Sequence, residues 1–239
     1  MCPSASGLRA KTIYLIRHAE TEENVRMKGF HDVGKALKNR QMPTPNDWKL
    51  GSEFVGMTLK GVTDSHLSSR GQRQVLQLKS ILDDNGLLDE VDLIAHSPLR
   101  RAKETCYGIF GLAAGISDDD MTTTATTTEK TKTNKPVVEL SCLQEITQLE
   151  HLTQGKRAVR KRINSFERWI ESQGEDVSTI AIVGHSEYFM IMLGVSEKFK
   201  NCDVWKAVYE PGGKWTVLEN EVRLDMFSSR NEDQGNDIF

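Results

Sequence analysis

Short apolar runs alternate with helix-like stretches along most of this chain, and that alternation constrains the fold more than any other feature of the sequence. The runs are rich in β-branched residues, which is typical of strands that are buried on both faces. They lie at Thr12–Arg17, Val91–His96, Pro136–Leu140, Thr179–Gly184 and Trp215–Asn220. Strands separated by helices in this way predict an α/β fold, a three-layer α/β/α sandwich around a mostly parallel central sheet.

Three helices are predicted between these strands. The first follows Ser68, which is a favoured N-cap residue type, and ends at Asn85-Gly86. The others are expected from Leu99 to about Gly108 and at Lys156–Ser172. The apolar residues at helical spacing are Val75, Leu78 and Leu82 in the first helix and Val159, Ile163, Phe166 and Ile170 in the third.

The length of the chain predicts one domain. Its 239 residues, 38% of them hydrophobic, can form one sizeable core. We therefore expect a single domain over residues 1–239 with its core at about 11–225. The threonine-rich and charged segment 117–135 is expected to be a mobile surface loop, and 228–239 a frayed tail. Segment 25–66 is long for a simple connection and could form a lid.

Charge and cysteine usage give expectations about partners and compartment. The net charge of -3 gives no general reason to expect nucleic acid or an anionic membrane as a partner. The four cysteines are far apart and show no metal-binding spacing, which indicates reduced thiols in a cytosol-like compartment. The first twelve residues lack the apolar region of a secretory signal, and organellar targeting stays open. We expect a cytoplasmic protein with no nucleic-acid or membrane partner, whose oligomeric state is open.

Charged and titratable residues follow four of the predicted strands. They are Arg17 and His18 after the first, Arg100 and Arg101 after the second, Glu145 after the third, and His185 after the fourth. Because the carboxyl ends of parallel strands meet at one edge of a sheet, these residues should converge on one crevice. Histidines, arginines and a carboxylate in one pocket indicate phosphate chemistry without a metal.

Each residue type in this set suits a step of phosphoryl transfer. Arginine grips phosphate oxygens through a planar, permanently charged fork. A neutral imidazole is a competent nucleophile near pH 7, and nearby arginines favour its unprotonated form. A carboxyl such as Glu145 could protonate the leaving oxygen and then activate water. Glu139, Glu150 and Glu187 lie nearby in the sequence, and Glu187 is the alternative acid.

Five motifs, in order, resemble those of the histidine phosphatases, also called the phosphoglycerate-mutase-like superfamily. They are Arg17-His18 with Asn24, LSSRGQRQ from Leu67, SPLRRAKET from Ser97, LQE ending at Glu145, and IVGHS containing His185. The resemblance extends from Lys11 to about Leu193 and implies a phosphoglycerate-mutase-like fold.

The resemblance implies a role for each matched residue. His18 would become the phosphohistidine and Glu145 would be the proton donor, which with His185 makes up the catalytic set. The phosphate oxygens would be held by Arg17, Asn24, Arg101 and His185, and Arg101 rather than Arg100 is the matching arginine. The activity implied is that of a metal-independent phosphomonoesterase without a cofactor. Its substrate would be a small-molecule phosphate ester or a phosphoprotein.

Several positions depart from the family pattern. Ala19 and Ser186 stand where glycine is usual, and both are small enough to keep the backbone close to a phosphate. Glu23 stands where phosphoglycerate mutases have tryptophan, which favours hydrolysis over isomerisation. The alternatives are a mutase of the phosphoglycerate type and a non-catalytic phosphatase-like module that binds a phosphoprotein.

Overall fold

A seven-stranded sheet forms the middle layer of the protein. The computed structural model describes residues 9–59, 64–112, 129–130, 135–145, 150 and 156–218, and in these residues the strand order is β3-β4-β2-β5-β1-β6-β7. The strands are β1 Lys11–Arg17, β2 Leu93–His96, β3 Glu129–Lys130, β4 Pro136–Glu139, β5 Thr179–Gly184, β6 Val204–Glu210 and β7 Lys214–Val217. The adjacent strands β4, β2, β5 and β1 run parallel, whereas β3, β6 and β7 pair antiparallel at the two sides. The predicted α/β fold is confirmed.

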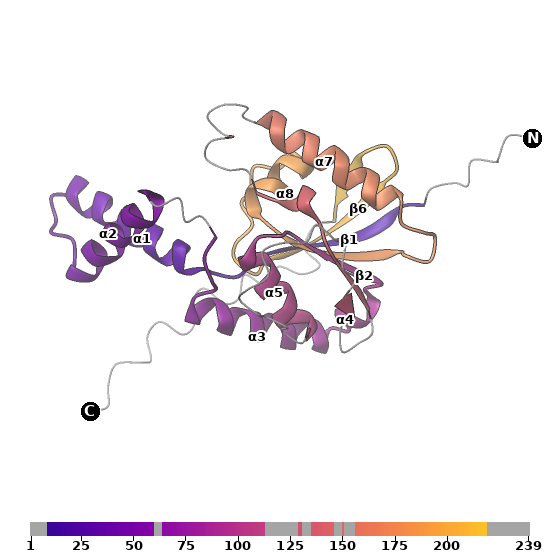
Figure 1. The fold of residues 1–239 in the computed structure, drawn as a ribbon, viewed down its shortest axis with the longest axis horizontal. Coiled ribbons are helices and arrows are strands. Elements are labelled where there is room, and N and C mark those ends of the chain that lie inside the picture. Colours follow the sequence, from indigo (N-terminus) through magenta and orange to yellow (C-terminus); the bar gives the residue numbers. More distant parts are fainter. Residues whose placement is uncertain are drawn as a thin grey trace, which may run out of the picture.

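Helices cover both faces of the sheet, which gives the molecule three layers (Figure 1). Helices α3, α4 and α5 pack on one face, and α7 and α8 pack on the other. The helices are α1 Glu22–Lys38, α2 Pro45–Leu59, α3 Ser69–Asp84, α4 Leu87–Glu90, α5 Arg100–Phe110, α7 Lys156–Glu171 and α8 Ser186–Leu193, with a 3-10 turn at Ser141–Leu143. None of the described helices has both the length and the apolar character needed to cross a bilayer.

The core consists of two apolar clusters, one on each face of the sheet. Side chains alternate between the faces along a strand, so Tyr14 and Ile16 of β1 join the cluster under α3 and α5. Ile13 and Leu15 join the cluster under α7 and α8. All the apolar residues predicted to lie on the inner faces of α3 and α7 are buried. The helical periodicity of the sequence therefore identified the faces that pack on the sheet.

The predicted strands are confirmed at the centre of the sheet and less accurate at its edge. The prediction for β5 matches the structure residue for residue, and that for β1 differs by one residue. The run predicted at Trp215–Asn220 is a strand only at Lys214–Val217. β6 is not among the predicted strands. Its sequence, VWKAVYE, mixes charged and apolar residues and therefore lacks the continuous apolar run used to predict the other strands. Charged residues are tolerated there because this strand near the edge is half-buried at several positions.

Parts of the loop and tail predictions fall outside the described residues. Of the predicted loop 117–135, the pair Glu129–Lys130 forms the short strand β3 against β4, which the prediction did not include. Lys135, the last residue of the predicted loop, donates through Nζ to the carbonyl oxygens of Leu88 and Asp89. The rest of that loop and the tail 228–239 lie outside the described residues, and the single domain over 1–239 stays a prediction.

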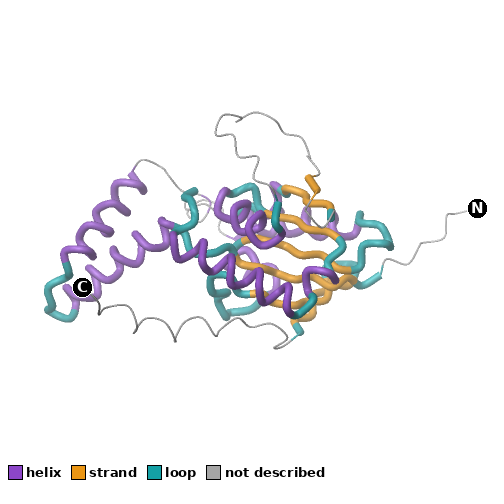
Figure 2. Tube along the Cα trace, turned by 90° about the horizontal axis from the view of Figure 1, so that it is seen from below, coloured by secondary structure: helices purple, strands orange, loops and turns teal. Residues whose placement is uncertain are grey.

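The segment 25–66 contains a helical hairpin of α1 and α2 instead of a simple connection. The hairpin extends away from the sheet, as two views at right angles show (Figures 1 and 2). Two glycines permit its close packing: a Cβ at Gly29 would lie 2.4 Å from Leu50 Cβ, and one at Gly51 would lie 3.4 Å from Phe30 Cα. In the described residues, most of this segment therefore projects from the body of the protein and does not cover the sheet edge as a lid would.

The start of α3 is packed against the chain that follows β1. Ser68 caps the helix through Oγ, which accepts from the Gly71 N–H, and its own N–H donates to the Glu20 carbonyl oxygen at 3.0 Å. A Cβ on Gly71 would lie only 2.0 Å from the same Glu20 oxygen. This contact fixes the loop after His18, and it explains why the motif LSSRGQRQ requires glycine at this position.

We expect Gly71→Ala to lower the free energy of unfolding by about 2 kcal/mol, because the backbone of Glu20 or of α3 must move to admit the methyl group. Urea unfolding followed by circular dichroism measures the change. Gly56→Ala in α2 is the matched control, since nothing lies within 4 Å of its Cβ position. That substitution should be neutral or stabilising by up to about 1 kcal/mol. Equal effects of the two substitutions would contradict the packing argument.

Candidate active site

The carboxyl ends of three parallel strands bring the predicted site residues to one edge of the sheet. The His18 N–H, just after β1, donates to the Gly184 carbonyl oxygen at 3.0 Å. The Ser97 N–H, just after β2, donates to the Val183 carbonyl oxygen at 3.0 Å. His185 follows β5 and occupies the N-cap position of α8. The backbone pairing thus places His18, Ser97 and His185 side by side before any side-chain contact is considered.

A pocket of about 450 Å³ lies at this edge. Its walls come from the end of β1 and the loop after it, the first two turns of α1 and of α8, the first turn of α5, Glu145 beyond the 3-10 turn, and Lys198 beyond α8. The lining residues are Arg17, His18, Thr21, Glu23, Asn24, Met27, Arg101, Glu145, Ser186, Glu187, Met190 and Lys198. Five of the six predicted site residues line it, and the ring centroid of the sixth, His185, lies 5.3 Å from that of His18.

His18 is buried and held in one orientation. Its Nδ1 lies 2.7 Å from the Ala19 carbonyl oxygen, which can only accept, so Nδ1 carries the hydrogen and Nε2 keeps a lone pair. Burial, followed by the positive charges of Arg17 and Arg101, holds the pKa of His18 well below its ordinary value. The imidazole is therefore neutral near pH 7, with a lone pair on Nε2.

The loop after His18 is fixed by backbone contacts. Ala19 is fully buried, and its N–H donates to the hydroxyl of Thr105 on α5 at 3.0 Å. The side-chain amide of Asn201 donates to the His18 carbonyl oxygen at 3.0 Å. A small residue is sufficient at position 19, so the departure from glycine leaves the loop close to the pocket.

His185 is completely buried and presents one unpartnered ring nitrogen. Its Nε2 lies 2.8 Å from the Ser97 hydroxyl oxygen. Its Nδ1 has no hydrogen-bond partner in the described part of the chain and lies 3.4 Å from Oε2 of Glu145. Burial, then the neighbouring His18 and the two arginines, holds the pKa of His185 well below its usual range. Nδ1 therefore lies next to the carboxylate of Glu145, a residue that lines the pocket.

Two arginines supply positive charge to the pocket. Arg17 donates through Nη1 to the Phe199 carbonyl oxygen at 2.6 Å, while its buried Nε has no partner among the described residues. Arg101 is held between two carboxylates, with Nη2 at 2.8 Å from Glu145 Oε2 and Nη1 at 3.3 Å from Asp64 Oδ1. Both forks are thus oriented before a ligand binds, which lowers the cost of gripping a phosphate.

Asn24 combines a structural contact with a place in the pocket. Its Oδ1 accepts from the Thr21 N–H at 3.2 Å, and its own N–H donates to Thr21 Oγ1, which completes the capping box of α1. Because the amide oxygen is engaged in the cap, the Nδ2 group is the end that can donate to a phosphate oxygen.

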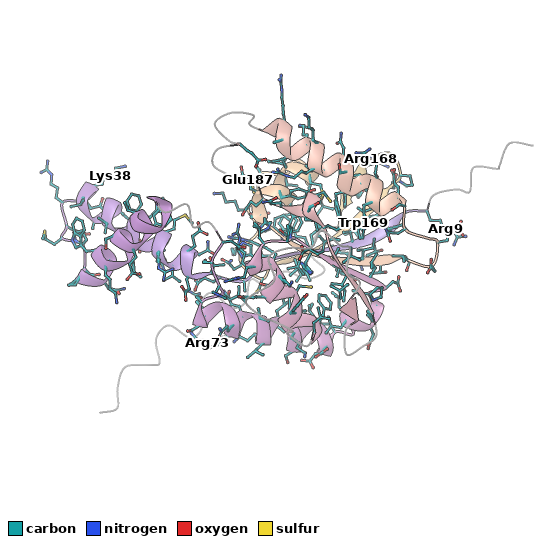
Figure 3. The ribbon with its side chains drawn as sticks, viewed as in Figure 1. Arg9, Lys38, Arg73, Arg168, Trp169 and Glu187 are labelled. Carbon is teal, nitrogen blue, oxygen red and sulfur yellow. The ribbon has the colours of Figure 1, made fainter. Side chains whose placement is uncertain are left out.

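The four candidate acids lie in different surroundings. Glu145 lines the pocket next to Arg101 and His185, and Glu187 lines it from α8. Glu187 lies on the side of the body that faces the α1–α2 hairpin (Figure 3). Glu139 instead approaches Lys103 at 3.9 Å, and Glu150 accepts from Arg162 at 2.6 Å. Only Glu145 and Glu187 of the four therefore line the pocket.

The side chains of His18, Glu145 and His185 could in principle share a metal ion. Their ligand atoms lie within 4.8 Å of one another. However, Arg17 and Arg101 line the same pocket, and Arg101 already donates to the Glu145 carboxylate. Two guanidinium groups stay charged at any working pH and repel a cation, so the electrostatics of the pocket favour an anion.

Several residues of the site are not among the sequence-predicted ones. Asp64 and Ser97 contact Arg101 and His185, and Glu23, Met27, Met190 and Lys198 line the pocket. Ser97 stands in the matched motif SPLRRAKET, which is a signal that could have identified it. The others are ordinary surface residue types whose direction no local pattern reveals.

Comparisons with known proteins identify the family of the chain. The model of the histidine phosphatase superfamily (branch 1) matches residues 52–222. Phosphoglycerate mutase-like protein 1 from Arabidopsis thaliana is 31% identical over 103 residues, which cover 43% of this chain and 28% of that protein. Phosphoglycerate mutase-like protein 2 from the same plant is 30% identical over 103 residues, 43% of this chain and 23% of that protein. The aligned stretch thus spans about a quarter of these curated relatives.

Solved structures share the fold. YhfR from Bacillus stearothermophilus has a TM-score of 0.51 at 18% identity and covers 87% of this chain and 95% of its own. Mycobacterial hydrolase 1 has a TM-score of 0.50 at 13% identity and covers 90% and 100%. A mycobacterial glucosyl-3-phosphoglycerate phosphatase has a TM-score of 0.50 at 14% identity and covers 87% and 97%. At such identities the likeness concerns the fold, and it agrees with the family match: the chain belongs to the histidine phosphatase superfamily.

Proposed function

We propose that the protein is a metal-independent phosphomonoesterase that works through a phosphohistidine on His18. The observation that carries the proposal is the state of this imidazole, which is neutral and keeps its Nε2 lone pair because Nδ1 is bonded to the Ala19 carbonyl. Arg17 and Arg101 line the same pocket, where they can hold the phosphate that this nitrogen attacks. Membership of the histidine phosphatase superfamily supports phosphate chemistry at this site.

In the first step, Nε2 of His18 forms a bond to phosphorus while the bond from phosphorus to the ester oxygen breaks. Arg17, Arg101, His185 and the Asn24 amide would hold the phosphoryl oxygens, on which charge is spread during the transfer. Glu145 would give a proton to the departing oxygen, so the alcohol leaves neutral. The unpartnered nitrogens of Arg17 and His185 support this role, since an oxyanion would supply their missing partner.

In the second step, water attacks the phosphohistidine. The Glu145 carboxylate takes the proton of that water, the oxygen bonds to phosphorus, and the nitrogen–phosphorus bond breaks with its electrons returning to Nε2. Inorganic phosphate and the neutral imidazole are restored. Arg101 would help Glu145 to transfer protons. A bound phosphate competes with Glu145 for the Nη2 donor of Arg101, and this competition releases the carboxyl group.

The phosphate chemistry limits the substrate class, and the cysteines bear on the compartment. A small-molecule phosphate ester or a phosphoprotein side chain would fit the chemistry. The three described cysteines, Cys106, Cys142 and Cys202, are free, and burial raises the pKa of each thiol, which fits inert thiols in a reducing, cytosol-like compartment.

A mutase and a non-catalytic binding module are the alternatives. A mutase must keep water out while the phosphohistidine persists, and Glu23 in place of tryptophan favours hydrolysis. Isomerisation of 3-phosphoglycerate without phosphate release would identify a mutase. Tight phosphate binding without turnover on any ester would identify a binding module.

We expect His18→Ala to lower phosphate release from p-nitrophenyl phosphate by ~10³-fold or more, because no other group can form the covalent intermediate. The assay contains EDTA, and added Mg²⁺ should not restore activity. His31→Ala is the control, since His31 is exposed on α1. An acid-labile phosphoryl group on the wild type that is missing in His18→Ala would locate the intermediate. Strong stimulation of the wild type by Mg²⁺ would contradict the mechanism.

We expect Glu145→Gln to slow hydrolysis according to how much the leaving group needs a proton. With an alkyl phosphate kcat/KM, which reports the transfer to His18 and not the later attack of water, should fall by about 100-fold or more. With p-nitrophenyl phosphate, whose leaving group departs as a stable anion, the fall in kcat/KM should be much smaller. Glu187→Gln is the matched comparison from the same pocket. If the dependence on the leaving group appears in Glu187→Gln instead, Glu187 is the acid.

We expect the acid limb of kcat/KM to lie below pH 6.5, because burial and then the charges of Arg17 and Arg101 lower the pKa of His18. Removing one of these charges with Arg17→Met should raise that pKa and move the limb to higher pH. Arg100→Met is the control, since Arg100 is exposed outside the pocket lining. If the acid limb of the kcat/KM profile lies at the same pH in Arg17→Met and wild type, the pKa of another group, such as the substrate phosphate, determines its position.

A further inference from the structure

We propose that the outer wall of the pocket selects phosphate esters of amino alcohols and that Glu23 binds the ammonium group of the leaving alcohol. The inference rests on the proposed function, because it concerns the alcohol part of a substrate whose phosphate is held by the arginines. The pocket, about 450 Å³, is in the size range of sites that enclose whole small molecules, so there is room beyond the phosphate.

Two adjacent glutamates on α1 point in different directions. Glu22 is half exposed and pairs with Arg26 one turn later, at 3.1 Å, along the outside of the helix. Glu23 instead lines the pocket, as does Met27 one turn later on the same side of α1. The Glu23 N–H donates to Ser65 Oγ at 3.1 Å, which anchors the start of the helix in this orientation. Only one of the two carboxylates can therefore reach a bound substrate.

Helix α8 presents a similar pair of side chains to the same pocket. Glu187 and Met190 line it, are half-buried and lie one turn apart. The outer wall thus consists of a carboxylate and a thioether from α1, a carboxylate and a thioether from α8, and Lys198 from the segment after α8. Carboxylates beside apolar methylene and methyl groups suit a short alkyl chain that carries a positive charge.

Among the described residues of the outer wall the charge balance is negative, with Glu23 and Glu187 against Lys198. Lys198 is the basic residue there, and its side chain is exposed, so solvent and salt screen it. Glu23 is half-buried, and its carboxylate has no hydrogen-bond partner among the described residues. Burial raises the pKa of Glu23. The positive charge of Arg101 lowers this pKa, and the negative charges of Glu145 and Asp64 raise it further.

A leaving group with a negative charge would meet repulsion at this wall. The charges of Arg17 and Arg101, which could offset it, are directed at the phosphate in the proposed mechanism. An ammonium group would instead supply the donor that the half-buried Glu23 carboxylate lacks, since a carboxylate taken from water needs a charged or donating partner. The expected preference is cationic over neutral over anionic leaving groups.

Three phosphate esters of nearly equal size test this preference. They are 2-aminoethyl phosphate, 2-hydroxyethyl phosphate and phosphoglycolate, which carry a positive, a neutral and a negative group at the same distance from the phosphate. For the wild type we expect kcat/KM for 2-aminoethyl phosphate to exceed that for phosphoglycolate by about 100-fold. In Glu23→Gln this ratio should fall by about tenfold.

Glu22→Gln is the matched control, because it removes a neighbouring carboxylate that faces solvent. It should leave the ratio unchanged. An equal ratio in Glu23→Gln and wild type, a wild-type preference for phosphoglycolate, or equal use of the neutral and cationic esters would overturn the inference while leaving the phosphatase proposal intact. Absence of phosphate release from all three esters and from p-nitrophenyl phosphate would overturn the proposed function itself, and the inference with it.

Discussion

Parallel pairing of β1 with β5 is the constraint on which the pocket depends. The register places Arg17 opposite Gly184, and the His18 N–H continues the ladder by donating to the Gly184 carbonyl. As a result the segments that follow β1 and β5 leave the sheet at the same level, and the ring centroids of His18 and His185 lie 5.3 Å apart. A slip of one residue in this register would turn one histidine to the other face of the sheet and separate the pair.

Burial of these two imidazoles has both a cost and a use. Burial removes water that would solvate the protonated imidazole, and this lowers the pKa values of both rings. The neutral ring that results is the form that can attack phosphorus in the proposed mechanism. The nearby guanidinium groups reinforce this neutral state, and Arg101 is kept in place by ion pairs with Asp64 and Glu145.

The accuracy of the sequence predictions follows the strength of the local pattern. β5 is a continuous apolar run, fully buried except at its first residue, so its limits could be read directly. α1 could not be predicted in the same way: Gly29 is its one buried residue in the described structure, because the helix packs on α2 and not on the sheet. The sequence could name pocket residues only where a motif contained them, and Glu22 and Glu23 are indistinguishable without the direction of their side chains.

The sequence by itself determined the fold class, the helix faces that pack on the sheet, and the residue types that stand at the strand ends. These are local properties, since periodicity, capping and motif spacing are set within a few residues. Only the tertiary structure decided which carboxylates hold Arg101 and which glutamate of α1 faces the pocket. Those features depend on contacts between residues that are far apart in the chain, and such contacts exist only once the sheet has brought its strand ends together.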